Sequence, residues 1–146
     1  MGGTSEARER NTGTGSWTQA FADKEEGGFA QALAEDVVLE ASALRRPIRG
    51  RETVALVMGT ASKVYESLEF TRQTRDGDRS YLEWEATAFG GMRLLGSTIL
   101  VRNDAGEITR AVIQHRPLQG LLAFSAELGR LLDGQVADGT FHRPDH

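Results

Sequence analysis

The sequence predicts an α+β protein in which a curved antiparallel β-sheet wraps around helices. Three polar turns divide the second half of the chain: Asp76-Gly77-Asp78, Gly90-Gly91 and Asn103-Asp104-Ala105-Gly106. Turns of this composition connect antiparallel strands. They separate four stretches of alternating apolar and polar residues: 64–75, 79–89, 92–102 and 107–115. Helical patterns precede and follow these stretches. We therefore expect a cone-shaped fold with three N-terminal helices, one C-terminal helix and an internal apolar pocket.

Composition excludes several classes of protein. The chain has 146 residues, which suffice for one domain with a sizeable core. It has no cysteine, so disulfides, thiolate metal sites and cysteine nucleophiles are excluded. No segment approaches the roughly 18 apolar residues of a membrane span, and residues 1–6 do not resemble a secretory signal. A net charge of −4 argues against nucleic-acid binding. We expect a cytoplasmic protein that contacts neither membrane nor nucleic acid.

The N-terminal part is expected to contain an arm followed by two helices. Residues 1–15 are rich in Gly, Ser, Thr and charged side chains, so we predict a disordered arm. Ser16 and Gln19 have the spacing of a capping box, which predicts that the first helix begins there. Gly27-Gly28 is predicted to end it. A short second helix would follow, with the apolar positions Phe29, Ala30 and Leu33.

The next segment predicts a strand and a third helix. Asp36 leads into Val37-Val38-Leu39, a β-branched run that is too short for a helix. Pro47 and Gly50 interrupt the chain before a new helical pattern begins at Arg51. Apolar positions then recur at helical spacing: Val54, Val57, Met58, Ala61, Val64 and Tyr65. One face of this helix should therefore be buried.

Alternation predicts which side chains of the sheet face inward. In the stretch 79–89 the inward set is Leu82, Trp84, Ala86 and Ala88, because a slip of one residue would bury two glutamates. The stretch 92–102 is apolar on both faces. A sheet of this kind needs a cover on its outer side. We therefore expect a homodimer formed through the outer face of the sheet.

Pro117 is expected at the first position of the closing helix, where its missing N–H has no helical partner. The apolar stripe of that helix consists of leucines: Leu118, Leu121, Leu122, Leu128, Leu131 and Leu132. We predict a single domain over 16–133 and a flexible C-terminal tail over 134–146. His142 and His146 lie in this tail and are interpreted as solvated residues. No metal or cofactor is expected.

Two regions carry a resemblance to a known family. They are the run from Ala34 to Glu40 with the following 47–52, and the run from Thr98 to Ile108. With the order helix, helix, strand, helix and four-stranded meander, the chain resembles the nuclear transport factor 2-like superfamily over 17–132. That superfamily includes ketosteroid isomerases and polyketide cyclases of the SnoaL type. The resemblance indicates the fold rather than the function, because this scaffold hosts many chemistries.

Catalytic positions of the ketosteroid isomerases can be compared with this chain one at a time. The resemblance implies that their general-base aspartate corresponds to Ala41, their oxyanion-binding aspartic acid to a position near Thr98, and their helical tyrosine to one near Trp17. Alanine cannot move a proton, and neither Trp17 nor Thr98 matches the acidity of the groups it would replace. We therefore do not expect a true ketosteroid isomerase.

His115 is the best remaining candidate for chemistry. It ends the last predicted strand, and an imidazole is the side chain whose ordinary pKa is closest to neutrality. It could move a proton, or it could simply hydrogen-bond a backbone group. Glu40 could orient it if it faces inward. Thr98 could donate its hydroxyl to a substrate oxygen, or it could be an ordinary strand residue.

Aromatic and apolar side chains suggest a ring-shaped ligand. The candidate ligand-binding residues are Trp17, Phe21, Phe70, Trp84 and Ile113. Two functions stay open. One is a cofactor-free isomerase, cyclase or dehydratase that acts next to a carbonyl through His115 and Thr98. The other is a non-catalytic dimeric module for binding or assembly, toward which the sequence leans. The arginines between 45 and 51 form either a solvated loop or an anion clamp at the pocket mouth.

Overall fold

The computed structural model describes residues 14–144. Its elements follow in the order α2 (Thr14–Asp23), α3 (Glu26–Ala32), β1 (Leu33–Ala41), β2 (Ile48–Arg49), α4 (Arg51–Val64), β3 (Ser67–Asp76), β4 (Arg79–Ala88), β5 (Met92–Arg102), β6 (Ile108–Arg116) and α5 (Leu118–Leu131). The four strands predicted from the polar turns are β3 to β6. The predicted arm lies outside the described residues except for its last two positions, which belong to α2. His146 also lies outside them.

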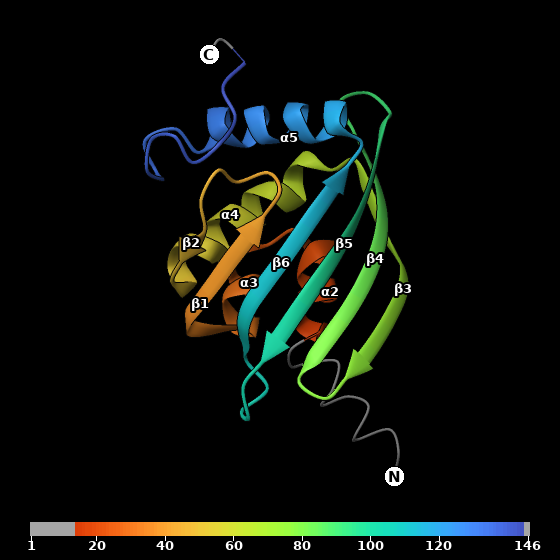
Figure 1. Ribbon diagram of the computed structural model, residues 1–146, viewed down its shortest axis with the longest axis vertical. Coiled ribbons are helices and arrows are strands. Elements are labelled where there is room, and N and C mark those ends of the chain that lie inside the picture. Colours follow the sequence, from red (N-terminus) through yellow and green to blue (C-terminus); the bar gives the residue numbers. More distant parts are fainter. Residues whose placement is uncertain (1–13, 145–146) are drawn as a thin grey trace.

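The six strands form one curved sheet in the order β2-β1-β6-β5-β4-β3. Helices α2, α3 and α4 cover one face of the sheet, and α5 crosses one end of it (Figure 1). The predicted α+β class is confirmed. Among the helices of the described part, none is long and apolar enough to span a membrane.

One strand pairing differs from the predicted antiparallel arrangement. β1 begins earlier than expected, at Leu33, and pairs with β6 in parallel, with Leu39 opposite Ala111. The short strand β2 then folds back on β1, with Val38 opposite Arg49. The sheet is therefore mixed. Alternation along a strand indicates which side chains are buried, but it carries no information about the direction of the neighbouring strand.

The predicted limits of the first helix are wrong at both ends. Ser16 lies inside α2, and the Gln19 side chain donates to Asp23 Oδ1 at 3.0 Å instead of completing a capping box. Lys24, with φ of 54°, follows the end of α2. Gly27 and Gly28 lie within α3. A Cβ at Gly28 would lie 3.1 Å from that of Ala20, so this glycine allows α2 and α3 to pack closely.

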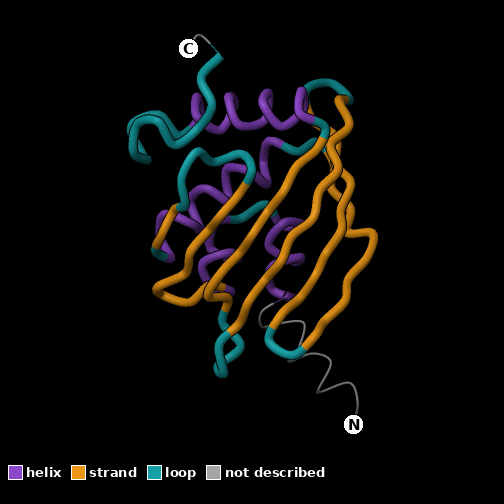
Figure 2. The backbone as a smooth tube through the Cα atoms, viewed as in Figure 1, coloured by secondary structure: helices purple, strands orange, loops and turns teal. Residues whose placement is uncertain are grey.

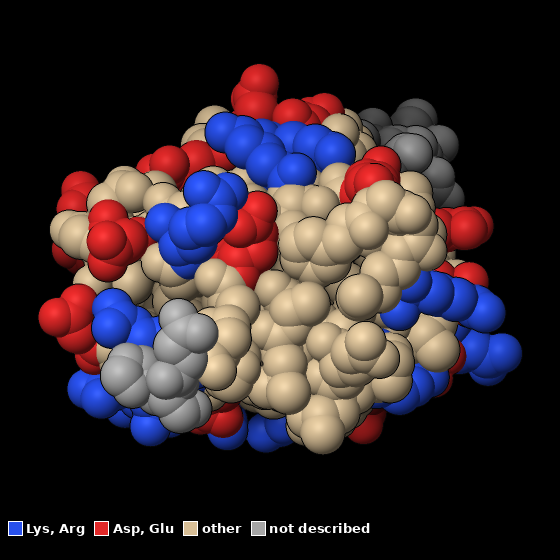
Figure 3. Space-filling model, turned by 90° about the horizontal axis from the view of Figure 1, so that it is seen from above, with Lys and Arg blue, Asp and Glu red and all other residues tan. Residues whose placement is uncertain are grey.

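The core lies between the sheet and its helices. The predicted inward set of β4 is confirmed, because Leu82, Trp84, Ala86 and Ala88 are all buried. On α5 the predicted leucine stripe is only partly right: Leu128 and Leu132 are buried, whereas Leu118, Leu122 and Leu131 are exposed. Pro117 is the N-cap rather than the first helical residue. Figure 3 views the end of the molecule that carries α5 and shows a broad uncharged surface there, with charged side chains around it.

The segment predicted as a flexible tail makes specific contacts, and we call its residues 139–142 the strap. Phe141 is buried and forms a β-bridge with Leu44. The N–H of Arg45 donates to the carbonyl of Thr140 at 2.8 Å. This part of the chain folds back from the end of α5 toward the loop that follows β1 (Figure 2). These contacts could not be predicted from the polar composition of 134–146, because they are made by one aromatic residue and a few backbone groups.

Candidate functional site

A small apolar cavity lies between the inner face of the sheet and the helices. Its volume is about 30 Å³. It is lined by Phe21, Leu39, Ala41, Ala43, Leu44, Val57, Met58, Ala61, Tyr65, Leu68, Phe70, Trp84, Thr98, Ile113, His115, Phe124 and Leu128. Such a space holds about one water molecule and is far below the roughly 300 Å³ at which typical ligand pockets begin. The free space is therefore no larger than one small functional group.

The last strand delivers His115 to this cavity. His115 alternates inward with Ala111 and Ile113 along β6, and it is buried. Its backbone N–H donates to Ser42 Oγ at 2.9 Å, which ties the end of β6 to the loop after β1. In the sheet register it lies opposite Gly96, which contributes no side chain to that position.

The imidazole of His115 forms a buried pair with Tyr65, the C-cap residue of α4. The distance between Tyr65 Oη and His115 Nε2 is 2.7 Å. Phe124 stacks on the imidazole with ring centroids 4.6 Å apart, and Trp84 contacts it edge-on at 5.0 Å. The other ring nitrogen, Nδ1, is buried and has no hydrogen-bond partner among the residues that the structure describes. An aromatic environment therefore surrounds one polar pair and one unpaired nitrogen.

Burial keeps both members of this pair neutral. It lowers the pKa of His115 from 6.5 to about 4 and raises the pKa of Tyr65 well above its usual value of 10. Desolvation is the cause in both cases, because it disfavours the charged form. A base with a pKa near 4 accepts a proton poorly at neutral pH. The arrangement therefore suits hydrogen bonding better than proton abstraction.

A second hydrogen-bonded pair lies on the neighbouring strands. Trp84 Nε1 donates to Thr98 Oγ1 at 3.0 Å, and both side chains are buried. The indole ring packs directly over Gly96, where any Cβ would overlap it. Trp84 is therefore held in one position by a hydrogen bond at its edge and by a glycine beneath its face.

The structure places most of the predicted site residues around the cavity and one of them outside it. His115, Thr98, Phe21, Phe70, Trp84 and Ile113 all line the cavity. Trp17 does not: it is fully buried against Phe21 and Phe29, with ring centroids 5.7 and 5.3 Å away. Helical spacing identified the buried face of Trp17 without showing which core residues it meets, and its role in ligand binding stays a prediction.

Glu40 and the arginine loop also lie away from the cavity. Glu40 points to the outer side of the sheet, where it accepts a hydrogen bond from Arg110 at 2.8 Å, so it cannot orient His115. Of the arginine loop, Arg45, Arg46 and Arg49 are exposed, and Arg51 donates to the carbonyl of Leu33 at 3.0 Å. None of these arginines lines the described cavity.

Sequence reasoning missed the role of Tyr65. It appeared only as the last apolar position of a helical stripe, yet its hydroxyl is the partner of His115. A signal existed: Tyr65 is the one member of that stripe with a polar tip, and a buried tyrosine hydroxyl usually finds a partner. Which residue it meets depends on tertiary contacts across 50 positions of sequence.

Ala41, which the resemblance places at the general-base position of the ketosteroid isomerases, lies in the cavity wall. The described lining residues include neither a carboxylate nor a lysine or arginine. Across residues 14–144, no three His, Asp or Glu side chains gather in a way that could hold a metal ion.

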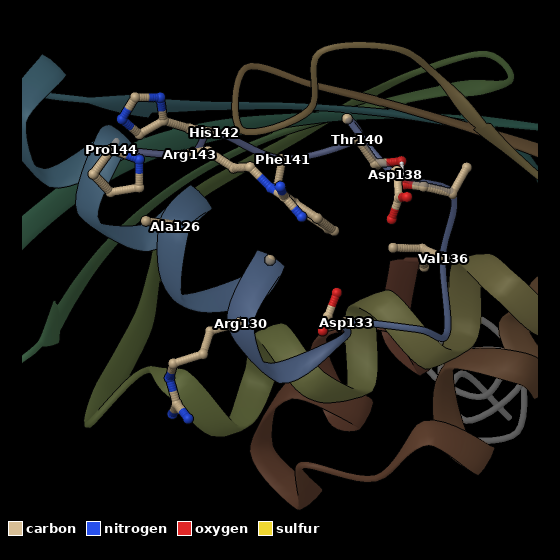
Figure 4. A pocket seen from close by; sticks show the side chains of 13 residues that line it. Ala126, Arg130, Asp133, Val136, Asp138, Thr140, Phe141, His142, Arg143 and Pro144 are labelled. Atoms are coloured by element: carbon tan, nitrogen blue, oxygen red, sulfur yellow. Dashed lines mark hydrogen bonds between the residues drawn. The ribbon is translucent and has the colours of Figure 1, made fainter. Parts of the chain in front are cut away.

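A larger hollow of about 350 Å³ lies between α5 and the residues that follow it. Figure 4 shows Asp133 and Asp138 reaching toward this hollow from opposite sides, whereas Arg130 points away from it. Arg130 pairs instead with Glu127 at 2.6 Å. The hollow is a polar surface feature, and no buried unpartnered side-chain atom was found among the described residues that line it. The internal cavity is therefore the better candidate site.

Comparisons with known proteins support the fold. Neither a family model nor a curated protein matches the chain. An uncharacterized protein with a cystatin-like fold from Silicibacter pomeroyi DSS-3 is 23% identical over 80% of this chain and 83% of its own, with a TM-score of 0.74. A steroid delta-isomerase from Pseudomonas aeruginosa is 28% identical over 82% and 88%, also with a TM-score of 0.74.

A third similar structure was solved with a bound molecule. It is a hypothetical protein with a ketosteroid isomerase-like fold from Catenulispora acidiphila DSM 44928, in complex with trimethylamine. It is 21% identical to this chain over 76% of this chain and 89% of its own, with a TM-score of 0.59. These similarities confirm the fold expected from the sequence resemblance.

Proposed function

We propose that this member of the nuclear transport factor 2-like superfamily binds a compact, largely apolar molecule in the cavity beside His115. The observation that carries the proposal is the buried Nδ1 of His115, which has no partner within residues 14–144 and lies in a largely apolar lining. Leaving such an atom unpaired costs about 1–3 kcal/mol. A ligand with one polar group and an apolar body would pair this nitrogen and bury its remaining surface against the aromatic wall.

The small volume of the cavity limits how such a ligand enters. The free space accommodates its polar group, and its apolar body has to displace lining side chains. Phe21, Leu44, Leu68 and Phe70 are only partly buried, so they can move at lower cost than the fixed Trp84. Met58 also lines the cavity, and its unbranched side chain adapts readily to a new shape.

Proton-transfer catalysis next to a carbonyl is the second candidate function. The Tyr65–His115 pair favours it, as does the similarity to a steroid delta-isomerase. Against it stand the alanine at position 41 and the low pKa of His115. An assay with a β,γ-unsaturated ketosteroid, followed by the absorbance of the conjugated product, distinguishes the two candidates. We expect no turnover; turnover that is lost in His115→Gln would establish the catalytic alternative.

Nuclear magnetic resonance tests binding directly, because the chain has two tryptophans and hence two indole N–H signals. Trp84 lines the cavity, whereas Trp17 lies outside it and reaches it only through Phe21, on which it packs. During titration with methylenecyclopentane or cyclopentanone, the Trp84 signal should shift and saturate, and the Trp17 signal should shift less.

A cavity-filling variant provides the matched control. Ala61 on α4 lines the cavity, and Thr60 beside it does not. Ala61→Leu should therefore abolish the saturable shift, and Thr60→Leu should leave it intact. If the Trp84 signal of the folded wild-type protein does not respond to either probe, the proposed function is wrong.

We also propose that the outer face of the sheet pairs with a second copy of the chain. Tyr81, Ile99 and Val112 lie side by side across β4, β5 and β6 on that face. Each is exposed or only partly buried. A contiguous row of apolar side chains on the outer face of a sheet is typical of a protein interface. The oligomeric state in solution tests this proposal.

A further inference from the structure

We infer that Tyr65 determines the chemical class of the ligand. Its hydroxyl places the proton of His115 on Nδ1, so the cavity offers hydrogen-bond donors. It therefore selects a molecule with an acceptor oxygen, such as a compact ketone or aldehyde. The inference rests on the proposed binding function and goes one step beyond it. It depends on which partner donates in each of the two buried pairs.

The first pair is Tyr65 with His115. A phenol carries one proton, and His115 Nε2 is the only partner recorded for Tyr65 Oη within the described residues. If Nε2 carried the imidazole proton, the phenolic proton would have no acceptor in this apolar surrounding, which is costly. Tyr65 therefore donates to Nε2. A neutral imidazole has a single proton, so that proton lies on Nδ1.

The second pair is Trp84 with Thr98. An indole N–H can only donate, so Thr98 Oγ1 is the acceptor in the 3.0 Å contact. The hydroxyl of Thr98 keeps its own proton, for which no acceptor is recorded in the described part of the chain. Thr98 lies two residues from Gly96, the residue opposite His115, and on the same face of the sheet. Two donors, His115 Nδ1–H and Thr98 O–H, therefore belong to one cavity.

Strong side-chain acceptors that make no hydrogen bond are missing from the described lining. Apart from Tyr65, Thr98 and His115, the described lining residues carry hydrocarbon or aromatic side chains, the weakly accepting thioether of Met58, or an indole that donates. A ligand N–H would find only the remaining lone pairs of Tyr65 Oη and Thr98 Oγ1, which already take part in hydrogen bonds, and a cationic amine would find no carboxylate. A carbonyl oxygen, which accepts and does not donate, satisfies the site.

Three five-membered rings separate these possibilities. Cyclopentanone carries an acceptor oxygen, methylenecyclopentane has nearly the same shape without one, and pyrrole carries a donor N–H. Their affinities can be measured from the shift of the Trp84 indole signal. Cyclopentanone should bind roughly tenfold more tightly than methylenecyclopentane, the effect of one net hydrogen bond. Pyrrole, whose N–H would find only oxygens that are already hydrogen-bonded, should gain less than cyclopentanone.

Variants test the role of Tyr65 as a positioning residue. Tyr65→Phe keeps the ring that stacks on Phe124 with centroids 4.9 Å apart. It removes the hydroxyl, so the imidazole proton is no longer held on Nδ1. The preference for cyclopentanone over methylenecyclopentane should then fall several-fold, a change that lost packing alone would not produce, since both probes have the same shape. Thr98→Val removes the second donor and should reduce the same ratio.

The ¹⁵N chemical shifts of the His115 ring give a readout without any ligand. They should show Nδ1 protonated and Nε2 as an acceptor in the wild type, and this pattern should be lost in Tyr65→Phe. Protonation at Nε2 in the wild type overturns the inference. So does binding of methylenecyclopentane with no gain for cyclopentanone, which leaves the proposed function intact. If none of the three rings binds, the proposed function itself is wrong.

Discussion

Lowering the pH should destabilise this protein through His115. The pKa of its imidazole falls from 6.5 to about 4 on folding, because burial disfavours the charged ring. Below pH 6.5 the unfolded chain therefore binds a proton that the folded chain does not. Stability is complete above the unfolded-state value and is lost as the pH falls toward the folded-state value.

The size of the effect follows from the same two values. Each unit of pKa difference corresponds to about 1.4 kcal/mol, so the contribution of His115 should decrease by roughly 2 kcal/mol between about pH 7.5 and pH 5, and by roughly 3 kcal/mol at about pH 3. This is a large part of the roughly 5–15 kcal/mol by which domains of ordinary stability are folded.

Urea unfolding of the wild type and of His115→Phe isolates this contribution. The variant keeps an aromatic ring but cannot titrate, and it leaves the Tyr65 hydroxyl unpaired at every pH. That cost is the same at every pH, so it shifts the difference in unfolding free energy between the two proteins by a constant and leaves its pH dependence unchanged. The contributions of all other titrating groups cancel in this difference. The wild type should lose stability relative to the variant as the pH falls from 6.5. A difference that stays constant from pH 7.5 to pH 4.5 would refute the reasoning.

Three further perturbations have expected outcomes. Gly96→Ala should lower the free energy of unfolding in urea by roughly 1–3 kcal/mol, because the added methyl group overlaps the fixed Trp84 ring; unchanged stability would contradict the close packing. Ser125→Ala removes an acceptor of one strap N–H and should speed hydrogen exchange there, with a loss of about 1–2 kcal/mol; unaltered exchange would show that the strap is held by other contacts. Ile99→Glu should convert a dimer into a monomer in light scattering, and a wild type that is already monomeric would disprove the proposed interface.

The strands were predictable because their signals are local. The turns at Asp76–Asp78 and Gly90–Gly91 lie at the ends of β3, β4 and β5, and period-two alternation indicated the buried face of β4. The same alternation is present in β6, where His115 is buried together with Ala111 and Ile113. None of these conclusions needs knowledge of a distant part of the chain.

The parts that could not be predicted depend on distant contacts. The parallel pairing of β1 with β6 joins segments some 70 positions apart, and the Tyr65–His115 bond joins residues 50 positions apart. Trp17 is an aromatic residue at a buried helical position, but the packing of α2 places it behind Phe21 and Phe29 rather than in the cavity wall. Sequence patterns identified which side chains are buried, whereas the partners of each buried side chain were set by the packing of the whole domain.

The strap also has a consequence for the cavity. Ser125 Oγ donates to the carbonyl of Ala43 at 2.6 Å and accepts from the N–H of His142 at 2.9 Å, and Phe141 pairs with Leu44. Ala43 and Leu44 belong to the cavity wall. The strap therefore braces this part of the wall from outside, and a substitution in it would act on the interior through residues that it touches rather than through the cavity itself.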